Sequence, residues 1–322
     1  MVEILGPLLR DRYEVISASS AHNMGWRMLD MVGAFMRYKS QVSVVLIDTY
    51  SAWSFYYCLI IAALCRLFRK PYIPILHGGN LPMRLRQNPL LSRFIFGHSA
   101  VNAAPSGYLH HAFTQAGYSA VLIPNFLHIS NYDFTPRQQV RARLLWVRSF
   151  HATYNPEMAI KIVAALVPVY PDIQLCMVGP DKDGSLERCR LLAEELGVAG
   201  RVTFTGLLTK SEWIALSADY DIFINTTNFD NTPVSVIEAM ALGLPVVSTN
   251  AGGMPFLIED GVDGLLVPQG DEKAFTAAVS HLLDNPELAL QISQKARQKV
   301  ELYDWDVVKY QWYEVIDSVG RE

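Results

Sequence analysis

Cysteine is scarce in this chain of 322 residues. Four cysteines are present, Cys58, Cys65, Cys176 and Cys189, and no two of them form a CxxC pair. So few thiols at these spacings exclude the disulfide framework that holds many small secreted domains together. We therefore expect a protein of a reducing, cytoplasmic compartment.

Long apolar runs are also lacking. The most lipid-like stretch, AWSFYYCLIIAALC at Ala52 to Cys65, has about 14 residues, whereas a helix that spans a bilayer needs about 20. Two interpretations stay open: a core helix packed on a sheet, or a helix in the membrane interface anchored by Arg66, Arg69 and Lys70. The opening MVEILGPLLRDRYEV carries acids and turns polar early, so no signal peptide is expected.

The composition is that of a globular protein. Apolar residues make up 51% of the chain and charged residues 18%, which excludes a disordered chain. A length of 322 residues exceeds the size at which one hydrophobic core stops growing. The sequence therefore predicts two domains of roughly 150 residues each.

The charge is unevenly distributed along the chain. Residues 1 to 145 hold 14 Lys and Arg against 6 Asp and Glu (+8), and residues 146 to 322 hold 13 against 25 (−12), which together give −4. A basic first half indicates an anionic partner, such as a phospholipid surface or a lipid-phosphate acceptor. Drift of surface charge without function is the alternative.

Strand and helix patterns alternate through both halves, which favours parallel sheets covered by helices. Strands are predicted at Tyr13–Ala18, Val42–Asp48, Tyr72–His77, Ser99–Ala103 and Ala120–Ile123, then at Leu144–Arg148, Ile173–Val178, Val202–Thr205, Ile222–Asn225, Pro245–Ser248 and Gly264–Val267. Helices of the second half are predicted at about 156–168, 185–196, 210–218, 233–242, 271–283 and 286–302.

This alternation predicts two Rossmann-like, doubly wound α/β domains in tandem. Apolar periodicity lapses between Asn125 and Arg143, where we place the seam. The predicted organisation is an N-terminal domain at 1–137, a C-terminal domain at 138–304, and a final helix at 305–322 that crosses back to the first domain. Ligands of such sheets bind beyond the carboxyl ends of the strands, so a cleft between two such edges is expected.

The stretch DNTPVSVIEAMALGLPVVSTNAGGMPFLI, residues 230 to 258, is the most informative part of the chain. Thr232 is a suitable N-cap and Pro233 suits the first helical position, and Gly243 is a suitable left-handed stop. The N-terminus of the predicted helix is an anion site. Gly252 and Gly253 allow a ligand to approach the backbone closely, or they form a simple strand-end turn.

Two carboxylates stand in this apolar stretch. Glu238 is expected to be partly buried, where an ionised carboxylate is costly unless donors such as the vicinal hydroxyls of a ribose satisfy it. Asp230 precedes the helix and is placed to accept a hydrogen bond from a sugar hydroxyl. The alternative is that the two acids are a cap and a surface charge.

The run DNTPVSVIEAMALGLPVVSTNAGGMPFLIEDGVDGLLVPQGD resembles the donor-binding signature of retaining GT-B glycosyltransferases, family 4 in particular. The resemblance includes two acids separated by seven residues and extends through MVGPDKDGS, VTFTGLLTKSEWIALSADYDIFINTT and YDWDVVKYQWYEVI, and more weakly to HGGN and IPN. It implies that Glu238 binds the nucleotide ribose and that Asp230 contacts the donor sugar. The donor-binding residues that it implies besides Glu238 are Asn231, Thr232, Pro233, Val234, Gly179 and Tyr154.

On the acceptor side, the resemblance implies an active-site role for His77 in ILHGGN and an acceptor-side position for Gly78, Gly79 and Asn80. Read alone, a strand-end histidine such as His77 is more often structural. Ser106 and Asn125 match positions near the cleft and hinge, although each also fits a simple turn.

The chain also departs from the family pattern. Asp230 replaces the usual first Glu, and Phe256 replaces an acid that often follows the Gly-Gly pair. Of the two cations that usually bind the diphosphate, Arg148 serves with a displacement of one place, and Tyr154 occupies the Lys position. The family's first strand and its glycine-rich loop are expected to be absent from the chain as given.

These features predict transfer of a hexose-type sugar from a nucleoside diphosphate donor to a hydroxyl, with retention, in glycan, polysaccharide or glycolipid synthesis. Catalytic roles fall to Asp230, His77 and Arg148. No cofactor besides the donor and no metal is expected, since DKD at 181–183 is not placed like a metal motif. The alternatives are an inactive nucleotide-sugar-binding scaffold subunit and a 2-epimerase, which needs further acids and a histidine. The expected location is the cytoplasm, with peripheral contact at the inner face of the membrane.

Overall fold

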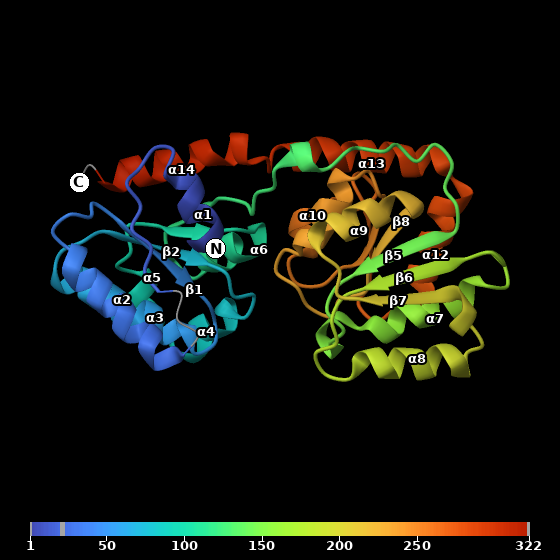
Figure 1. Cartoon of the computed structure of the whole chain (residues 1–322), viewed down its shortest axis with the longest axis horizontal. Coiled ribbons are helices and arrows are strands. Elements are labelled where there is room, and N and C mark those ends of the chain that lie inside the picture. The colour runs from blue at the N-terminus through green and yellow to red at the C-terminus, as the bar shows by residue number, and fades with distance from the viewer. Residues whose placement is uncertain (1, 20–22, 321–322) are drawn as a thin grey trace. The chain divides into compact units, whose positions relative to one another are not determined.

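The computed structural model describes residues 2–19 and 23–320, and these form two compact units. Unit 1 comprises residues 1–125 and 306–322, and unit 2 comprises residues 126–305. Both units are parallel α/β structures, which confirms the predicted fold class (Figure 1). Each unit is described below by itself.

Unit 1 is built on a four-stranded parallel sheet with the order β1-β2-β3-β4. The central strand β2, YIPIL, is buried along its whole length, as expected of a parallel strand covered on both faces. Its elements are α1 Val2–Leu9, α2 Met24–Tyr38, β1 Val45–Thr49, α3 Ser54–Leu67, β2 Tyr72–Leu76, α4 Leu81–Gln87, α5 Pro89–Phe96, β3 Asn102–Ala104, α6 Gly107–Gln115, β4 Ala120–Leu122 and α14 Trp305–Gly320.

The strand predicted at Tyr13–Ala18 is wrong, because these residues form no strand. Side-chain contacts with α14 hold this segment instead. The Tyr13 hydroxyl donates to Asp317 Oδ1 at 2.6 Å, and its ring meets the Tyr313 ring edge-on with centroids 5.8 Å apart. An alternating pattern of a few residues cannot distinguish such a segment from a strand.

Unit 2 carries a six-stranded parallel sheet with the order β10-β9-β8-β5-β6-β7. Two hydrophobic clusters form its core, one containing Trp146 and Phe275 and the other Phe223 and Met240. Its elements are β5 Arg143–Val147, α7 Pro156–Leu166, β6 Gln174–Val178, α8 Ser185–Glu195, β7 Val202–Gly206, α9 Lys210–Leu216, β8 Ile222–Asn225, α10 Val234–Ala241, β9 Val246–Thr249, α11 Met254–Leu257, β10 Leu265–Val267, α12 Glu272–Asp284 and α13 Pro286–Glu301, with short 3₁₀ turns η1 Ile129–Asn131, η2 Ala152–Tyr154, η3 Ala199–Arg201 and η4 Ser217–Asp219.

The chain passes from unit 1 to unit 2 after Asn125, at the start of the seam expected between Asn125 and Arg143 and before the domain bound drawn at residue 137. The segment after Asn125 packs on unit 2, because the Leu127 amide donates to the Tyr303 carbonyl at 2.9 Å and Tyr132 is buried. Arg137 is buried as well and donates to the Leu242 carbonyl at 2.5 Å. These contacts use backbone groups and the single side chains of a tyrosine and an arginine, so no periodic pattern reports them.

Candidate functional site

The strand order of unit 2 reverses between β5 and β8, which are neighbours in the sheet. In open α/β sheets, ligands bind outside the carboxyl ends of the strands at this kind of switch point. Arg148 directly follows β5, and Asp230 lies in the loop that follows β8. The topology therefore brings together two of the residues that the sequence singles out.

Arg148 and Asp230 form an ion pair through the guanidinium Nη2 and the carboxylate Oδ2. The other carboxylate oxygen of Asp230, Oδ1, accepts a hydrogen bond from the Asn231 amide at 2.8 Å. Tyr154 covers the guanidinium, whose carbon lies 4.6 Å from the ring centroid. Burial lowers the pKa of Arg148, and its Nε is buried without a hydrogen-bond partner among the described residues. A cation held in this way, with an unused donor, can bind an oxyanion.

Gly252 and Gly253 lie against the loop of Asp230 and Asn231. A Cβ on Gly252 would overlap the Asp230 carbonyl, and one on Gly253 would overlap the Asn231 carbonyl. The Gly253 amide also donates to the Asp230 carbonyl at 2.8 Å. The close approach expected at this glycine pair is thus made to the chain's own backbone, and it fixes the loop that carries Asp230.

Helix α10 begins at Val234, with Pro233 at the N-cap in an extended conformation (φ −69°, ψ 118°). Thr232 is therefore not the N-cap, and the prediction that placed Pro233 at the first helical position is wrong by one residue. Gly243 does end the helix in the left-handed region, with φ +79°. Ser235, in the first turn, lines a pocket of about 310 Å³ together with Arg148, Gly179, Lys210 and Trp213.

Gly179 follows β6 and explains part of the pocket's shape. Its φ is +150°, and a Cβ there would overlap the Arg148 carbonyl. The Arg148 amide donates to the Val178 carbonyl at 3.0 Å, so β5 and β6 stay paired up to the pocket. A side chain at position 179 would push the two strand ends apart.

Glu238, in the second turn of α10, is only 4% exposed. Its Oε1 accepts a hydrogen bond from the Tyr132 hydroxyl at 2.7 Å and pairs with the Lys210 ammonium at 2.7 Å. Burial and the neighbouring carboxylate raise the pKa of Tyr132, so its hydroxyl stays protonated and donates. The expected burial of Glu238 is confirmed, and the donors that satisfy it include the chain's own Tyr132 and Lys210.

Tyr132 and Lys210 were not among the residues predicted from the sequence. Tyr132 lies in the segment expected to belong to the other domain, and Lys210 is the first residue of α9 after Thr209, whose capping box with Glu212 explains the start of that helix. No motif reports either contact. The detectable signal was the burial expected of Glu238, because a buried carboxylate requires donors.

The acids of DKD at 181–183 cap local backbone. Asp181 Oδ1 accepts from the Gly184 amide at 3.0 Å, and Asp183 accepts from the Ala152 amide at 2.8 Å. The Ser185 hydroxyl, followed by the Ala152 amide, lowers the pKa of Asp183 to about 2. These bonds account for both acids as turn and helix-start residues.

In unit 1, His77 follows β2 and pairs through Nε2 with Asp48 Oδ1 at 2.8 Å. Tyr50 lies beside it, with ring centroids 5.0 Å apart. Asp48, near the end of the neighbouring strand β1, was not predicted from the sequence. The Asp48 carboxylate orients the histidine ring. Both side chains are partly exposed, so the ring can still contact a ligand at this edge of the sheet.

The turn of Gly78, Gly79 and Asn80 connects His77 to α4. A Cβ on Gly78 would stand 2.6 Å from the Ser51 amide nitrogen, so this glycine lets the loops after β1 and β2 approach each other. Ser106 is the N-cap of α6 and accepts from the Leu109 amide at 3.2 Å. That contact fits the reading of Ser106 as a turn residue.

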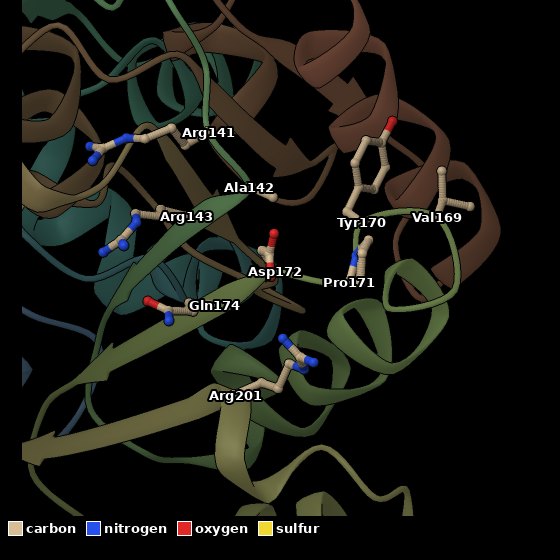
Figure 2. A pocket seen from close by; sticks show the side chains of 9 residues that line it. All are labelled: Arg141, Ala142, Arg143, Val169, Tyr170, Pro171, Asp172, Gln174 and Arg201. Carbon is tan, nitrogen blue, oxygen red and sulfur yellow. The ribbon is translucent and has the colours of Figure 1, made fainter.

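A second pocket, of about 630 Å³, lies at the opposite edge of the unit 2 sheet, where β5, β6 and β7 begin. Figure 2 shows the side chains of Arg141 and Arg143 pointing away from Tyr170 and Asp172. Arg141 is already paired with Asp221, its Nε lying 2.7 Å from the carboxylate. The lining groups of this pocket do not converge, so we place the candidate site at the switch-point edge.

A chain with two parallel α/β units of this kind has the GT-B fold. Solved structures share it: HepE of Anabaena in complex with UDP has a TM-score of 0.79 at 20% identity, covering 97% of this chain and 88% of that one. Sucrose-phosphate synthase from Thermosynechococcus elongatus has a TM-score of 0.75 at 21% identity, covering 91% and 78%. The model of the family described as glycosyl transferases group 1 matches residues 134–299, just over half of the chain, and the chain belongs to this family.

Curated relatives match parts of the chain. A D-inositol 3-phosphate glycosyltransferase of Corynebacterium glutamicum is 31% identical over 155 residues, which are 47% of this chain and 37% of the relative. A phosphatidyl-myo-inositol mannosyltransferase of Mycobacterium leprae is 28% identical over 210 residues, or 63% and 55%. The chain spans between 37% and 42% of the length of three such relatives, all of them D-inositol 3-phosphate glycosyltransferases. Across the described residues, no helix is both long and apolar enough to cross a membrane.

Proposed function

We propose that this protein is a retaining glycosyltransferase of family 4 that transfers a sugar from a nucleoside diphosphate sugar to an acceptor hydroxyl. The observation that supports this most is the clustering of Arg148, Asp230, Lys210 and Glu238 around the switch-point edge of unit 2. The two cations can bind a diphosphate, and the two carboxylates can accept hydrogen bonds from sugar hydroxyls. In the protein without a donor, each carboxylate is paired with one of the cations.

Glu238 is the proposed ribose ligand. Its side chain is 4% exposed, so two vicinal hydroxyls can reach the carboxylate only when it has one fixed orientation. Tyr132 and Lys210 both hold Oε1, which orients the carboxylate without a change of rotamer on binding. This preorganisation reduces the entropy cost of binding.

Arg148 is the proposed diphosphate ligand, together with the amides at residues 232 and 234 and with the Asn231 amide once it leaves Asp230 Oδ1. Within the part of the chain that the structure describes, its Nε is a buried donor without a hydrogen-bond partner, and Ser235 on the first turn of α10 lines the pocket beside Arg148. A helix N-terminus with a nearby guanidinium favours a phosphate. Lys210 lines the pocket too and supplies positive charge that Tyr154, at the usual Lys position, lacks.

Asp230 is the proposed ligand of the donor sugar. It holds Arg148 before the donor binds, and a diphosphate that attracts the guanidinium leaves the carboxylate free to accept a sugar hydroxyl. Leaving-group stabilisation by Arg148 and the α10 N-terminus supplies the electrostatic part of catalysis, with the donor phosphate accepting the proton from the acceptor. In unit 1, His77, which Asp48 orients, keeps the catalytic role proposed for it from the family resemblance.

The acceptor is proposed to be anionic or membrane-borne. The names of the relatives mention D-inositol 3-phosphate and phosphatidyl-myo-inositol, both of which carry phosphate. The basic first half of this chain, +8 over residues 1 to 145, agrees with such an acceptor and with peripheral contact at the inner face of a membrane.

A scaffold subunit that binds nucleotide sugars without turnover is the second candidate. Tyr154 in place of a cation and the existing Arg148–Asp230 pair favour it. Incubating the protein with UDP-, GDP- and ADP-sugars and following the sugar anomer released to water by NMR separates the two candidates. Release of the donor's own anomer first supports a retaining transferase, release of the opposite anomer contradicts retention, and binding without release supports the scaffold.

A further inference from the structure

Helix α3 is apolar on both sides. Phe55, Cys58 and Cys65 face the core, and on the opposite side Tyr56, Ile60 and Leu67 are 38%, 38% and 73% exposed. Arg66 is the only charged residue in the helix. An exposed helix of a globular protein normally has charged or polar residues on its outer side, so a second apolar side needs an explanation.

The neighbouring helices continue this apolar side. On α2, Trp26 and Leu29 are 66% and 63% exposed, and Trp53, just before α3, is 71% exposed. The Tyr57 hydroxyl donates to the Met24 carbonyl at 3.2 Å and so joins α3 to α2, and the two helices lie side by side (Figure 1). The Arg66 guanidinium lies 4.2 Å from the Phe94 ring and joins α3 to α5. We call the exposed apolar residues of these helices the outer helix surface: Trp26, Leu29, Trp53, Tyr56, Ile60, Leu67 and Leu90.

Positive charge predominates in the segment that carries the outer helix surface. Residues 24 to 97 hold nine Lys and Arg against two Asp and Glu. Arg37, Arg69 and Arg93 are exposed and belong to the helices and the loop that carry this surface. Exposed Trp, Tyr and Leu next to cations form the composition that binds at the boundary between lipid headgroups and acyl chains.

We propose that the outer helix surface docks onto an anionic phospholipid membrane, with α2 and α3 lying in the interface. A second copy of the chain is the less favoured occupant, because a two-fold interface would place the same cations opposite each other. The proposal deepens the acceptor side of the proposed function, but membrane binding itself requires neither donor nor turnover.

The test is co-sedimentation of the protein with two kinds of vesicle. One contains phosphatidylcholine alone, and the other contains phosphatidylcholine and the anionic lipid phosphatidylglycerol in a ratio of about 7:3, which gives the vesicle a negative surface charge. We expect binding to the mixed vesicles only, weakened by salt. Trp26→Ala with Trp53→Ala should weaken it at least about tenfold, and each of Arg69→Gln and Arg93→Gln by about fivefold. The matched control is Leu191→Ala with Leu302→Ala in unit 2, where side chains that are 57% and 61% exposed are removed with no expected effect.

The outcomes separate the ideas. Absence of binding to mixed vesicles, or equal loss in the control, overturns the proposal. A concentration-dependent dimer in sedimentation velocity that the Trp variant abolishes assigns the surface to a second copy and also overturns it. Calorimetry with UDP, GDP and ADP on the same variants shows whether they remain folded and keep the donor site, so failure at the membrane is distinguishable from failure of the proposed function.

Discussion

The hydrogen bond from Tyr132 to Glu238 is expected to stabilise unit 2 measurably. Tyr132 is 3% and Glu238 4% exposed, and the hydroxyl meets Oε1 at 2.7 Å. A hydrogen bond to a charged group contributes about 1.5–3 kcal/mol, and one to a neutral acceptor about 0.5–1.5 kcal/mol. Tyr132→Phe should therefore lower the free energy of unfolding by about 2 kcal/mol, because a buried carboxylate loses a donor.

Glu238→Gln keeps an oxygen for the tyrosine but removes the charge, so the hydrogen bond should weaken by about 1 kcal/mol. The loss of the ion pair with Lys210 should add less than about 1 kcal/mol, since that lysine side chain is 61% exposed. The loss of unfolding free energy in the double variant should be about 1 kcal/mol smaller than the sum of the losses in the two single variants, as is usual for residues in contact.

The assay is urea unfolding of the wild type, the two single variants and the double variant, together with hydrogen exchange of the β8 and β9 amides. Exchange is needed because the two units need not unfold as one cooperative transition. Losses that add within about 0.3 kcal/mol would refute the reasoning, because they would mean that the two side chains do not interact energetically.

Four further outcomes are expected. Gly253→Ala should destabilise the protein by about 2–4 kcal/mol through overlap with the Asn231 carbonyl, whereas Gly200→Ala, with open space around it, should be neutral in the same thermal melts. Asp230→Ala should cost about 3 kcal/mol by leaving Arg148 buried and unpaired, and should lower turnover more than nucleotide affinity; equal loss of both would leave Asp230 a purely structural role. The four thiols are buried, and burial raises their pKa, to about 12 for Cys58, so the native protein should resist a thiol reagent at pH 8 that labels all four after denaturation. Burial also raises the pKa of Tyr132 above the ordinary 10, so its contribution to stability is complete below pH 10 and is lost as pH rises further; a difference in tyrosinate absorbance between the wild type and Tyr132→Phe that appears before unfolding would contradict this.

The strands and helices of unit 2 were predictable from the sequence because each is a short apolar run with a clear stop, as at β8, whose bounds match the prediction. The segment at Tyr13–Ala18 was not, since its contacts with Asp317 and Tyr313 depend on residues about 300 positions away. The same reason applies at the site. The local sequence pattern predicts the helix that carries Glu238. The contact of its carboxylate with Tyr132, which lies 106 residues earlier, forms only when the chain folds.

The proposal that the switch-point edge of unit 2 binds a nucleoside diphosphate sugar is tested most directly by calorimetric titration with UDP, GDP and ADP, followed by their sugar conjugates. The account predicts saturable binding of one nucleotide, weakened about 5- to 150-fold in Glu238→Gln by the loss of about 1–3 kcal/mol from the ribose hydrogen bonds. Absence of binding to all three nucleotides, or an affinity unchanged in a folded Glu238→Gln variant, would contradict it.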